Sequence, residues 1–349
     1  MKKVLNKHLH TAKTTKQDEF YTQLSDIEKE LKHYKQHFKG KVVFCNCDDP
    51  RVSNFFHYFS HSFEQLGLKK LITTCYKNQS ADLFSQNESE KAIYLEYTGD
   101  KNKNKVPDPN EIGIKHLKGD GDFRSKECIE LLKQADIVVT NPPFSLFREY
   151  VEQLIEYNKK FLIIGNINAI SYKECFKLIK KNQIWLGASI HSGDREFGVP
   201  DYYPLTAASY RIGDDGKKYI RVKGVRWFTN LDYKERHEDL ILYKTYSTAG
   251  YPKYDNYDAI EVSKTADIPC DYYGNIGVPI TFLDKYNPNQ FEILGITDRG
   301  NEWGLKTKEY TLEDVENPGD LNRRAVLIIG NMHKPTYARL LIKRKKAWK

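Results

Sequence analysis

Apolar positions along the chain follow two spacings, one typical of amphipathic helices and the other of buried strands. Steps of three and four residues predict a helix over about 17–38, with an apolar face made of Phe20, Leu24, Ile27, Leu31, Tyr34 and Phe38. Gly40 ends this helix, and the β-branched and aromatic run 41–46 predicts a buried strand. Further strand candidates lie at 68–76, 91–97, 136–140 and 161–165, and helical spacings lie at 55–66, 124–134 and 146–155.

Strands that alternate with helices are typical of βαβ units, in which the strands lie parallel in one sheet. We therefore predict an α/β, Rossmann-like fold for residues 1–190, with a mainly parallel sheet and helices on both faces. Ligands bind outside the carboxyl ends of the strands in such sheets, so residues directly after strands are the first candidates for a site. The turn-rich stretch 98–118 has no period and is expected to be an exposed loop.

The composition changes after residue 190, where aromatic, glycine and basic residues mix in short segments. Alternation over 219–228 predicts a half-exposed strand. We expect residues 191–349 to form a β-containing region, from which strands could return to the first sheet. Residues 323–349 contain nine Lys or Arg and no acidic residue, which predicts either a solvated basic terminus or a segment that grips phosphates.

Charge and residue usage narrow the classes of protein further. Lysine and arginine exceed aspartate and glutamate by 55 − 47 = 8, which favours a polyanionic partner. The apolar runs are far shorter than the roughly 20 residues of a membrane helix, and the start lacks the apolar stretch of a secretory signal. We therefore expect a cytoplasmic protein without membrane contact. Six cysteines without paired metal-ligand spacing predict reduced thiols and no metal site.

The most specific chemical signal is Asn141-Pro142-Pro143-Phe144, directly after the predicted strand 136–140. The two prolines fix the backbone and lack N–H groups, so the segment is rigid and rich in hydrogen-bond acceptors. Acceptors beside the flat ring of Phe144 suit a planar exocyclic amine on an aromatic base. The alternative is that the prolines only end the strand before a helix capped by Ser145. The position after a buried strand favours the amine site.

With this segment the chain resembles the S-adenosylmethionine-dependent amino-methyltransferases, and in particular the EcoRI-type adenine-specific DNA methyltransferases. The likeness covers most of the chain and rests on Asp18–Thr22, Phe44–Pro50, Ser53–Phe56, Gly121–Ser125, Asp136–Ser145 and Gly277–Asp284. It implies a methyltransferase fold followed by a target-recognition region. The implied activity is site-specific methylation, by S-adenosylmethionine, of the N6 amine of an adenine flipped out of double-stranded DNA. It also implies a restriction–modification system whose cognate endonuclease acts separately, and GAATTC as the first site to test.

The same resemblance implies roles for single residues. Asn141 and the carbonyl of Pro142 would hold the adenine amine, Pro143 completes the motif, and Phe144 would stack on the flipped base. The residues implied to contact the cofactor are Phe20, Tyr21 and Thr22 near its methionine end, Asn46, Asp48, Asp49 and Pro50 near its amino-acid portion, and Asp122 and Phe123 at its adenine. Two of these have plainer alternatives, since Phe20 also lies on the apolar helix face and Asp122 could cap the next helix.

Two features depart from the general pattern of methyltransferases. The segment 47–54 contains no glycine, a feature that the EcoRI-type enzymes share, and the strand candidate 71–76 has no terminal acid to meet the cofactor ribose. The residue that binds the ribose is therefore left open.

DNA contacts are expected from the region after residue 190, because arginine pairs bidentately with guanine and lysine neutralises phosphates. The candidates are Arg195, Arg221, Lys223, Arg226, Arg323 and Arg324. Each of them could instead be an ordinary surface charge. Two other functions stay open: methylation of an RNA base or a protein glutamine amide, and a catalytically idle DNA-binding protein of the same fold.

Overall fold

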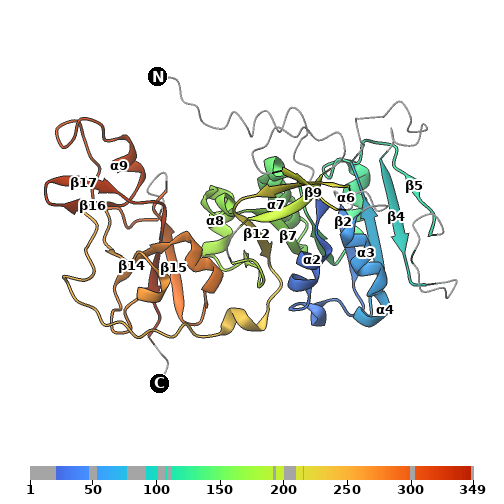
Figure 1. Ribbon diagram of the computed structural model, residues 1–349, viewed down its shortest axis with the longest axis horizontal. Helices are drawn as coiled ribbons and strands as arrows, with labels where there is room; N and C mark the ends of the chain where they lie inside the picture. The colour runs from blue at the N-terminus through green and yellow to red at the C-terminus, as the bar shows by residue number, and fades with distance from the viewer. Residues whose placement is uncertain are drawn as a thin grey trace. The chain divides into compact units, whose positions relative to one another are not determined.

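The structure is a computed structural model that describes residues 21–46, 53–76, 92–100, 107, 112–191, 194–199, 210–214, 216–298 and 303–346. The chain divides into two compact units (Figure 1). Unit 1 comprises Met1–Ala169 and Leu186–Asp232, and unit 2 comprises Ile170–Trp185 and Tyr233–Lys349. This division differs from the expected boundary at residue 190, because residues 186–232 pack with the N-terminal unit while 170–185 pack with the C-terminal one.

An eight-stranded sheet forms the centre of unit 1. Its order is β5 (Lys115–His116), β4 (Ile93–Tyr97), β3 (Lys70–Thr74), β2 (Val42–Asn46), β6 (Ile137–Thr140), β7 (Lys160–Asn166), β12 (Val225–Thr229) and β8 (Trp185–Leu186). The four strands β3, β2, β6 and β7 are parallel, and β4, β5 and β12 run antiparallel to their neighbours. The parallel strands are buried along almost their whole length, as the β-branched and aromatic runs predict.

Helices cover both faces of this sheet, as the predicted α/β fold requires. Trp227 and Phe228 are consecutive on β12, so their side chains point to opposite faces. Phe55 on α3 (Asn54–His61) packs edge-on against Trp227, and Phe147 on α7 (Phe147–Glu156) packs against Phe228. The other helical segments of unit 1 are α2 (Leu24–Leu31), η1 (Lys35–His37), α4 (Phe63–Leu66), α6 (Lys126–Gln134), η2 (Phe144–Leu146) and part of η3 (Ile167–Ser171).

The first helix is shorter than the helix predicted over 17–38. Tyr21–Thr22 form β1, which pairs antiparallel with β9 (Arg195–Val199), and α2 begins only at Leu24. A small sheet of order β1-β9-β11-β10 includes β11 (Lys218–Val222) and β10 (Tyr210–Ile212). The predicted apolar face is nevertheless buried at its later positions, since Tyr34 and Phe38, which flank η1, are fully buried.

The single strand predicted over 219–228 is two strands. Gly224, at φ 68°, lies in the turn that separates β11 from β12. Beyond this turn all five residues of β12 are buried, and the strand pairs with β7 in the central sheet. A strand from the later part of the chain therefore completes the first sheet.

Unit 2 contains a four-stranded sheet of order β13 (Ile260–Glu261), β14 (Asn275–Pro279), β18 (Arg339–Arg344) and β15 (Phe291–Ile296). A hairpin of β16 (Val326–Ile329) and β17 (Met332–Pro335) forms a second sheet. The helices are α8 (Lys173–Lys180) and α9 (Gly319–Arg323), with short 3₁₀ turns at η4 (Lys234–His237), η5 (Thr265–Asp267) and η6 (Ile280–Lys285).

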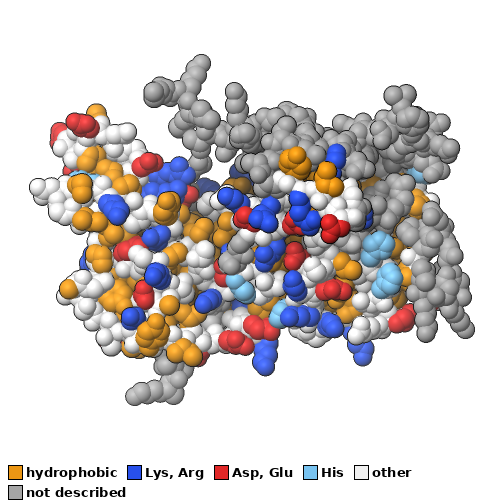
Figure 2. Space-filling view, in the orientation of Figure 1, with side chains coloured by type: hydrophobic (Ala, Val, Ile, Leu, Met, Phe, Trp, Pro, Cys, Tyr) orange, Lys and Arg blue, Asp and Glu red, His pale blue; other side chains and the backbone are white. Residues whose placement is uncertain are grey.

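The basic C-terminal stretch is not a solvated tail over its described length. Its residues 339–344 form β18, an inner strand of the sheet whose Leu340, Leu341 and Ile342 are buried. Arg339 pairs with the buried carboxylate of Glu261 at 2.8 Å. Lys and Arg side chains on the face shown in Figure 2 lie among acidic and apolar ones. Within the described residues, no helix is long and apolar enough to span a membrane.

Candidate active site

Three parallel strands of unit 1 end at one level. Asn46 closes β2, Thr74 closes β3 and Thr140 closes β6, and all three residues are buried. Asn46 and Thr74 are register partners, and the Thr140 hydroxyl donates to the backbone carbonyl of Asn46. Polar side chains thus collect at the carboxyl edge of the parallel strands, where open α/β sheets bind their ligands.

The segment Asn141–Phe144 leaves this edge directly after β6. Asn141 is 5 % exposed, whereas Phe144 is half-buried and starts the short 3₁₀ turn that leads into α7. The N-cap residues of η2 and α7 are Pro143 and Leu146, and neither makes a side-chain cap, whereas the plainer alternative expected Ser145 at that position. The motif therefore places an amide and an aromatic ring at the strand edge.

Tyr150 links the motif's helix to the end of β2. It lies one turn into α7, is fully buried, and donates its hydroxyl to the side-chain oxygen of Asn46. Its ring meets that of Phe123 edge-on, with centroids 5.0 Å apart. From the sequence, Tyr150 is only one of the apolar positions in the helical spacing over 146–155. A signal that could have found its role is that a buried tyrosine needs an acceptor for its hydroxyl.

The segment 119–123 reaches the carboxyl end of β3. Gly121 has φ 77°, and an added Cβ would lie 2.7 Å from the Ala92 side chain, so only glycine fits this turn. The Gly121 carbonyl accepts from the Cys128 thiol at 3.5 Å, and burial raises the pKa of this thiol, which keeps it protonated as a donor. Gln153 of α7 donates to the Phe123 carbonyl at 3.1 Å.

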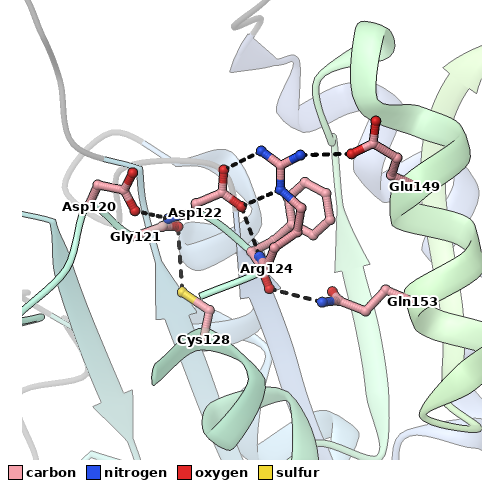
Figure 3. A network of polar contacts seen from close by, with 8 residues as sticks. Asp120, Gly121, Asp122, Arg124, Cys128, Glu149 and Gln153 are labelled. Carbon is pink, nitrogen blue, oxygen red and sulfur yellow. Dashed lines mark hydrogen bonds and ion pairs between the residues drawn. The ribbon is translucent and has the colours of Figure 1, made fainter. Parts of the chain in front are cut away.

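Asp122 and Arg124 form a forked ion pair (Figure 3). Arg124 donates Nε to Oδ1 at 2.9 Å and Nη2 to Oδ2 at 2.7 Å, and its backbone N–H donates to Oδ1 at 2.9 Å. The Nη1 of Arg124 donates to Oε2 of Glu149 on α7 at 2.7 Å. The hydrogen bond to Asp122 raises the pKa of the Arg124 guanidinium. Ser125, and not Asp122, caps α6 by accepting from the Cys128 N–H.

Three threonines of this region bury hydroxyls that have no hydrogen-bond partner among the described residues: Thr73 and Thr74 at the end of β3, and Thr22 in β1. The Thr22 carbonyl accepts from Asn54 at the start of α3, at 2.7 Å. A buried hydroxyl without a partner is costly, which is consistent with a polar ligand at this edge. The donors and acceptors present therefore fit a cofactor such as S-adenosylmethionine.

The structure brings together only part of the predicted cofactor set. Asn46, Asp122 and Phe123 are linked through Tyr150, Gln153 and neighbouring groups, while Tyr21 and Thr22 belong to the β1–β9 pair. The predicted contacts that lie outside the described residues are Phe20, Asp48, Asp49 and Pro50. No group of three or more potential metal ligands occurs within the described parts of the chain.

The candidate DNA contacts of unit 1 have different surroundings. Arg221 and Lys223 are exposed at the end of β11 and in the turn after it, and Arg195 on β9 donates to the Asp194 carbonyl at 3.1 Å. Arg226 is only 3 % exposed and donates to the carbonyls of Val225 and His191. Arg226 is therefore not exposed at the surface, because β12 is an inner strand.

The two arginine candidates of unit 2 are both engaged by one carboxylate. Arg323 and Arg324 pair with Asp298 at 2.9 Å and 2.8 Å. A DNA phosphate would have to compete with this ion pair for either guanidinium.

Comparisons with known proteins agree on one family. The family model described as adenine-specific methyltransferase EcoRI matches residues 8–345. The chain is 55 % identical to Type II methyltransferase M.EcoRI of Escherichia coli over 83 % of this chain and 89 % of that protein. It is 41 % identical to Type II methyltransferase M.MgeORF184P of Mycoplasma genitalium, over 82 % of this chain and 85 % of the relative. No solved structure gives a significant match.

Proposed function

Because this chain belongs to the EcoRI family of adenine-specific DNA methyltransferases, we propose that it uses S-adenosylmethionine to methylate the N6 amine of an adenine flipped out of duplex DNA. The observation that carries the proposal is the position of Asn141–Phe144. This motif leaves the sheet edge at which the polar ends of β2 and β3 and the segment 119–123 converge. The family match and this geometry are independent supports for one site.

The proposed cofactor site uses side chains from β2, β3, α7 and the segment 119–123. Asn46 and Tyr150 would orient the amino-acid portion beside the segment 47–50, and the Thr74 hydroxyl would take the place of the missing acid at the ribose. Asp122 accepts three hydrogen bonds from Arg124 in the structure. In this proposal the adenine amine of the cofactor donates to the Asp122 carboxylate and competes with Arg124 for its oxygens.

The Arg124 guanidinium already covers the Phe123 ring on which the cofactor's adenine is proposed to stack. Phe123 is 7 % exposed, and the Arg124 guanidinium lies 5.2 Å from its ring centroid. An adenine on the face that Arg124 covers would displace the guanidinium. In this proposal Arg124 holds Asp122 in place until the cofactor binds.

The proposed catalytic role of the motif follows from its acceptors. The Asn141 amide oxygen and the Pro142 carbonyl would accept the two N–H protons of the target amine, and Phe144 would stack on the flipped base. Such hydrogen bonds draw the nitrogen lone pair out of the ring and aim it at an electrophile. When bound, S-adenosylmethionine supplies an electrophilic methyl group on its sulfonium. Pro142 and Pro143 keep the acceptors fixed because their backbone angles cannot relax.

Recognition of the DNA sequence is proposed to use residues after about 190, among them the exposed Arg221 and Lys223. The relatives are named as Type II methyltransferases. We therefore propose that this chain protects cytoplasmic DNA from a cognate endonuclease that acts as a separate protein, and that GAATTC is the first sequence to test.

The test is methyl transfer from labelled S-adenosylmethionine to duplex DNA, to RNA and to a glutamine-containing peptide in parallel. Label in duplex DNA alone is the expected result. Label in RNA or peptide alone would replace the DNA proposal by one of those substrates. Cofactor binding without label in any acceptor would favour the catalytically idle DNA-binding alternative.

A further inference from the structure

A basic pocket lies in unit 2, apart from all the residues considered so far. Its volume is about 570 Å³, and it is lined by Lys173, Lys177, Lys180, Lys181 and Trp303. The four lysines belong to α8 and its C-terminal cap, and Trp303 belongs to the segment after β15. Pockets of this size are in the range of small-ligand and nucleotide sites.

The spacing of α8 explains why the lysines share one face. Positions 173, 177, 180 and 181 fall within an arc of about 100° on a helix with 3.6 residues per turn. The opposite face is buried through Cys175, Phe176 and Ile179. The helix is thus anchored by its apolar side and presents a row of ammonium groups on the other.

Trp303 closes the pocket with an aromatic surface. Lys180 Nζ lies 5.0 Å from its ring centroid, and Phe176 supports the ring edge-on with centroids 5.0 Å apart. The side chain is held in place by this packing and is half-buried, not withdrawn into the core. An aromatic ring among cations suits a ligand with both an anionic and a flat or apolar part.

Several basic residues of unit 2 are neutralised by a carboxylate, whereas three of the pocket lysines are not. Arg323 and Arg324 share Asp298, Arg339 pairs with Glu261, and Lys306 pairs with Glu309. In contrast, Lys177, Lys180 and Lys181 form no ion pair with any described residue. Glu174 is on the same helix but does not line the pocket. Like charges at this spacing repel one another, so a polyanion would relieve the repulsion.

We infer that this lysine–tryptophan pocket binds the sugar–phosphate backbone of the DNA substrate. The row from Lys173 to Lys181 spans about 12 Å at 1.5 Å per residue. The phosphates of one DNA strand recur about every 3.4 Å along the helix axis but wind around it, so the row is long enough to contact about two of them. Trp303 contacts a sugar or an unstacked base between them. The inference rests on the DNA substrate of the proposed function.

The test is DNA binding by the full chain as a function of salt, measured by fluorescence anisotropy with a GAATTC duplex and a scrambled duplex. The affinity falls as salt rises, and each phosphate contact adds about 0.9 to the steepness of log K against log salt. Loss of one contact therefore lowers the affinity at 0.1 M salt about eightfold. The double variant Lys177→Ala/Lys181→Ala should therefore make the slope less steep by about 1.8 and lower the affinity for both duplexes by about 60-fold. The loss should be equal for the two duplexes because phosphate contacts carry no sequence information.

The matched control is Lys264→Ala/Lys285→Ala, which removes the same charge from exposed positions of unit 2 outside the pocket. It should leave the slope unchanged. A second variant, Trp303→Leu, should weaken DNA binding without changing the slope, whereas Trp303→Phe should retain most of the affinity. Circular dichroism and urea titration of each variant, compared with the wild type, show whether the fold is intact.

Three outcomes overturn the inference. Equal slopes for the pocket variant and the control would exclude phosphate contact. A loss confined to the GAATTC duplex would assign the lysines to base recognition instead. Binding of a mononucleotide at the pocket, with DNA affinity unchanged, would make it a nucleotide site. If the wild-type chain bound no DNA under any condition, the proposed function itself would fail first, and the two failures are therefore distinguishable.

Discussion

Replacing Tyr150 with phenylalanine removes one hydroxyl from the point where the motif's helix meets the end of β2. Tyr150 is fully buried and Asn46 is 4 % exposed, so no water is expected to replace the lost donor. A buried acceptor left without its partner costs about 1–3 kcal/mol. We predict that Tyr150→Phe lowers the free energy of unfolding by this amount in urea titrations.

The same substitution should also affect the cofactor, because Tyr150 orients the Asn46 amide. A loss of about 1.4 kcal/mol in binding corresponds to a tenfold higher KM for S-adenosylmethionine. The matched control is Tyr157→Phe, which removes a hydroxyl at the end of the same helix, where the described residues offer it no hydrogen-bond partner. If Tyr150→Phe matched Tyr157→Phe in both stability and KM, the assignment of Asn46 and Tyr150 to the cofactor site would be refuted.

Four further substitutions give distinct results. Gly121→Ala should cost about 1–2 kcal/mol from φ 77° alone and raise the KM for S-adenosylmethionine; wild-type stability and KM would contradict the tight turn. Arg226→Ala should destabilise the fold, measured in urea, whereas Arg221→Ala should weaken DNA binding, measured by anisotropy; exchanged effects would contradict their burial. Burial raises the pKa of the Glu261 carboxyl, but hydrogen bonds from Arg339 outweigh this effect and hold the pKa below its usual value of 4.5. The ion pair of Glu261 with Arg339 therefore stabilises the fold fully above about pH 4.5, and this stabilisation is lost as the pH falls through the lowered pKa. Glu261→Gln should flatten this acid dependence in urea titrations, and an unchanged dependence would show that another group causes it.

The central sheet could be predicted because its strands are short continuous apolar runs between helical spacings. Val42–Asn46 and Ile137–Thr140 have too few polar residues for any exposed structure, and both are buried strands. The family resemblance and the activity could also be predicted, because the Asn141–Phe144 motif and its companions are specific in type and order. The family match confirms that assignment.

Pairing between distant segments could not be predicted. The stripe from Phe20 to Phe38 is helical in period, but Tyr21–Thr22 pair with β9 almost 180 residues later, and this long-range contact overrides the local pattern. Similarly, the alternation over 219–228 hides a turn at Gly224, and nothing local shows that β12 is buried between β7 and β8. Because this burial is not visible in the sequence, Arg226 was included among the candidate DNA contacts.

The hydrogen-bond network around Asp122 likewise could not be predicted from the sequence. A sequence reveals that an acid and an arginine are neighbours, but not that Arg124 takes up both oxygens of Asp122 and reaches Glu149 on another helix. Tyr150 is similar, because its place in an apolar stripe explains its ring and not its hydroxyl.

The most direct test of the central claim compares wild-type chain with Asn141→Ala on unmodified DNA and S-adenosylmethionine. Products are digested to nucleosides for mass spectrometry and sequenced with a modification-sensitive method, and cofactor affinity is measured by calorimetry. We predict N6-methyladenine at one sequence motif for the wild type, and none for the variant despite nearly unchanged cofactor binding. Full turnover by Asn141→Ala, or a methylated base other than adenine, would contradict it.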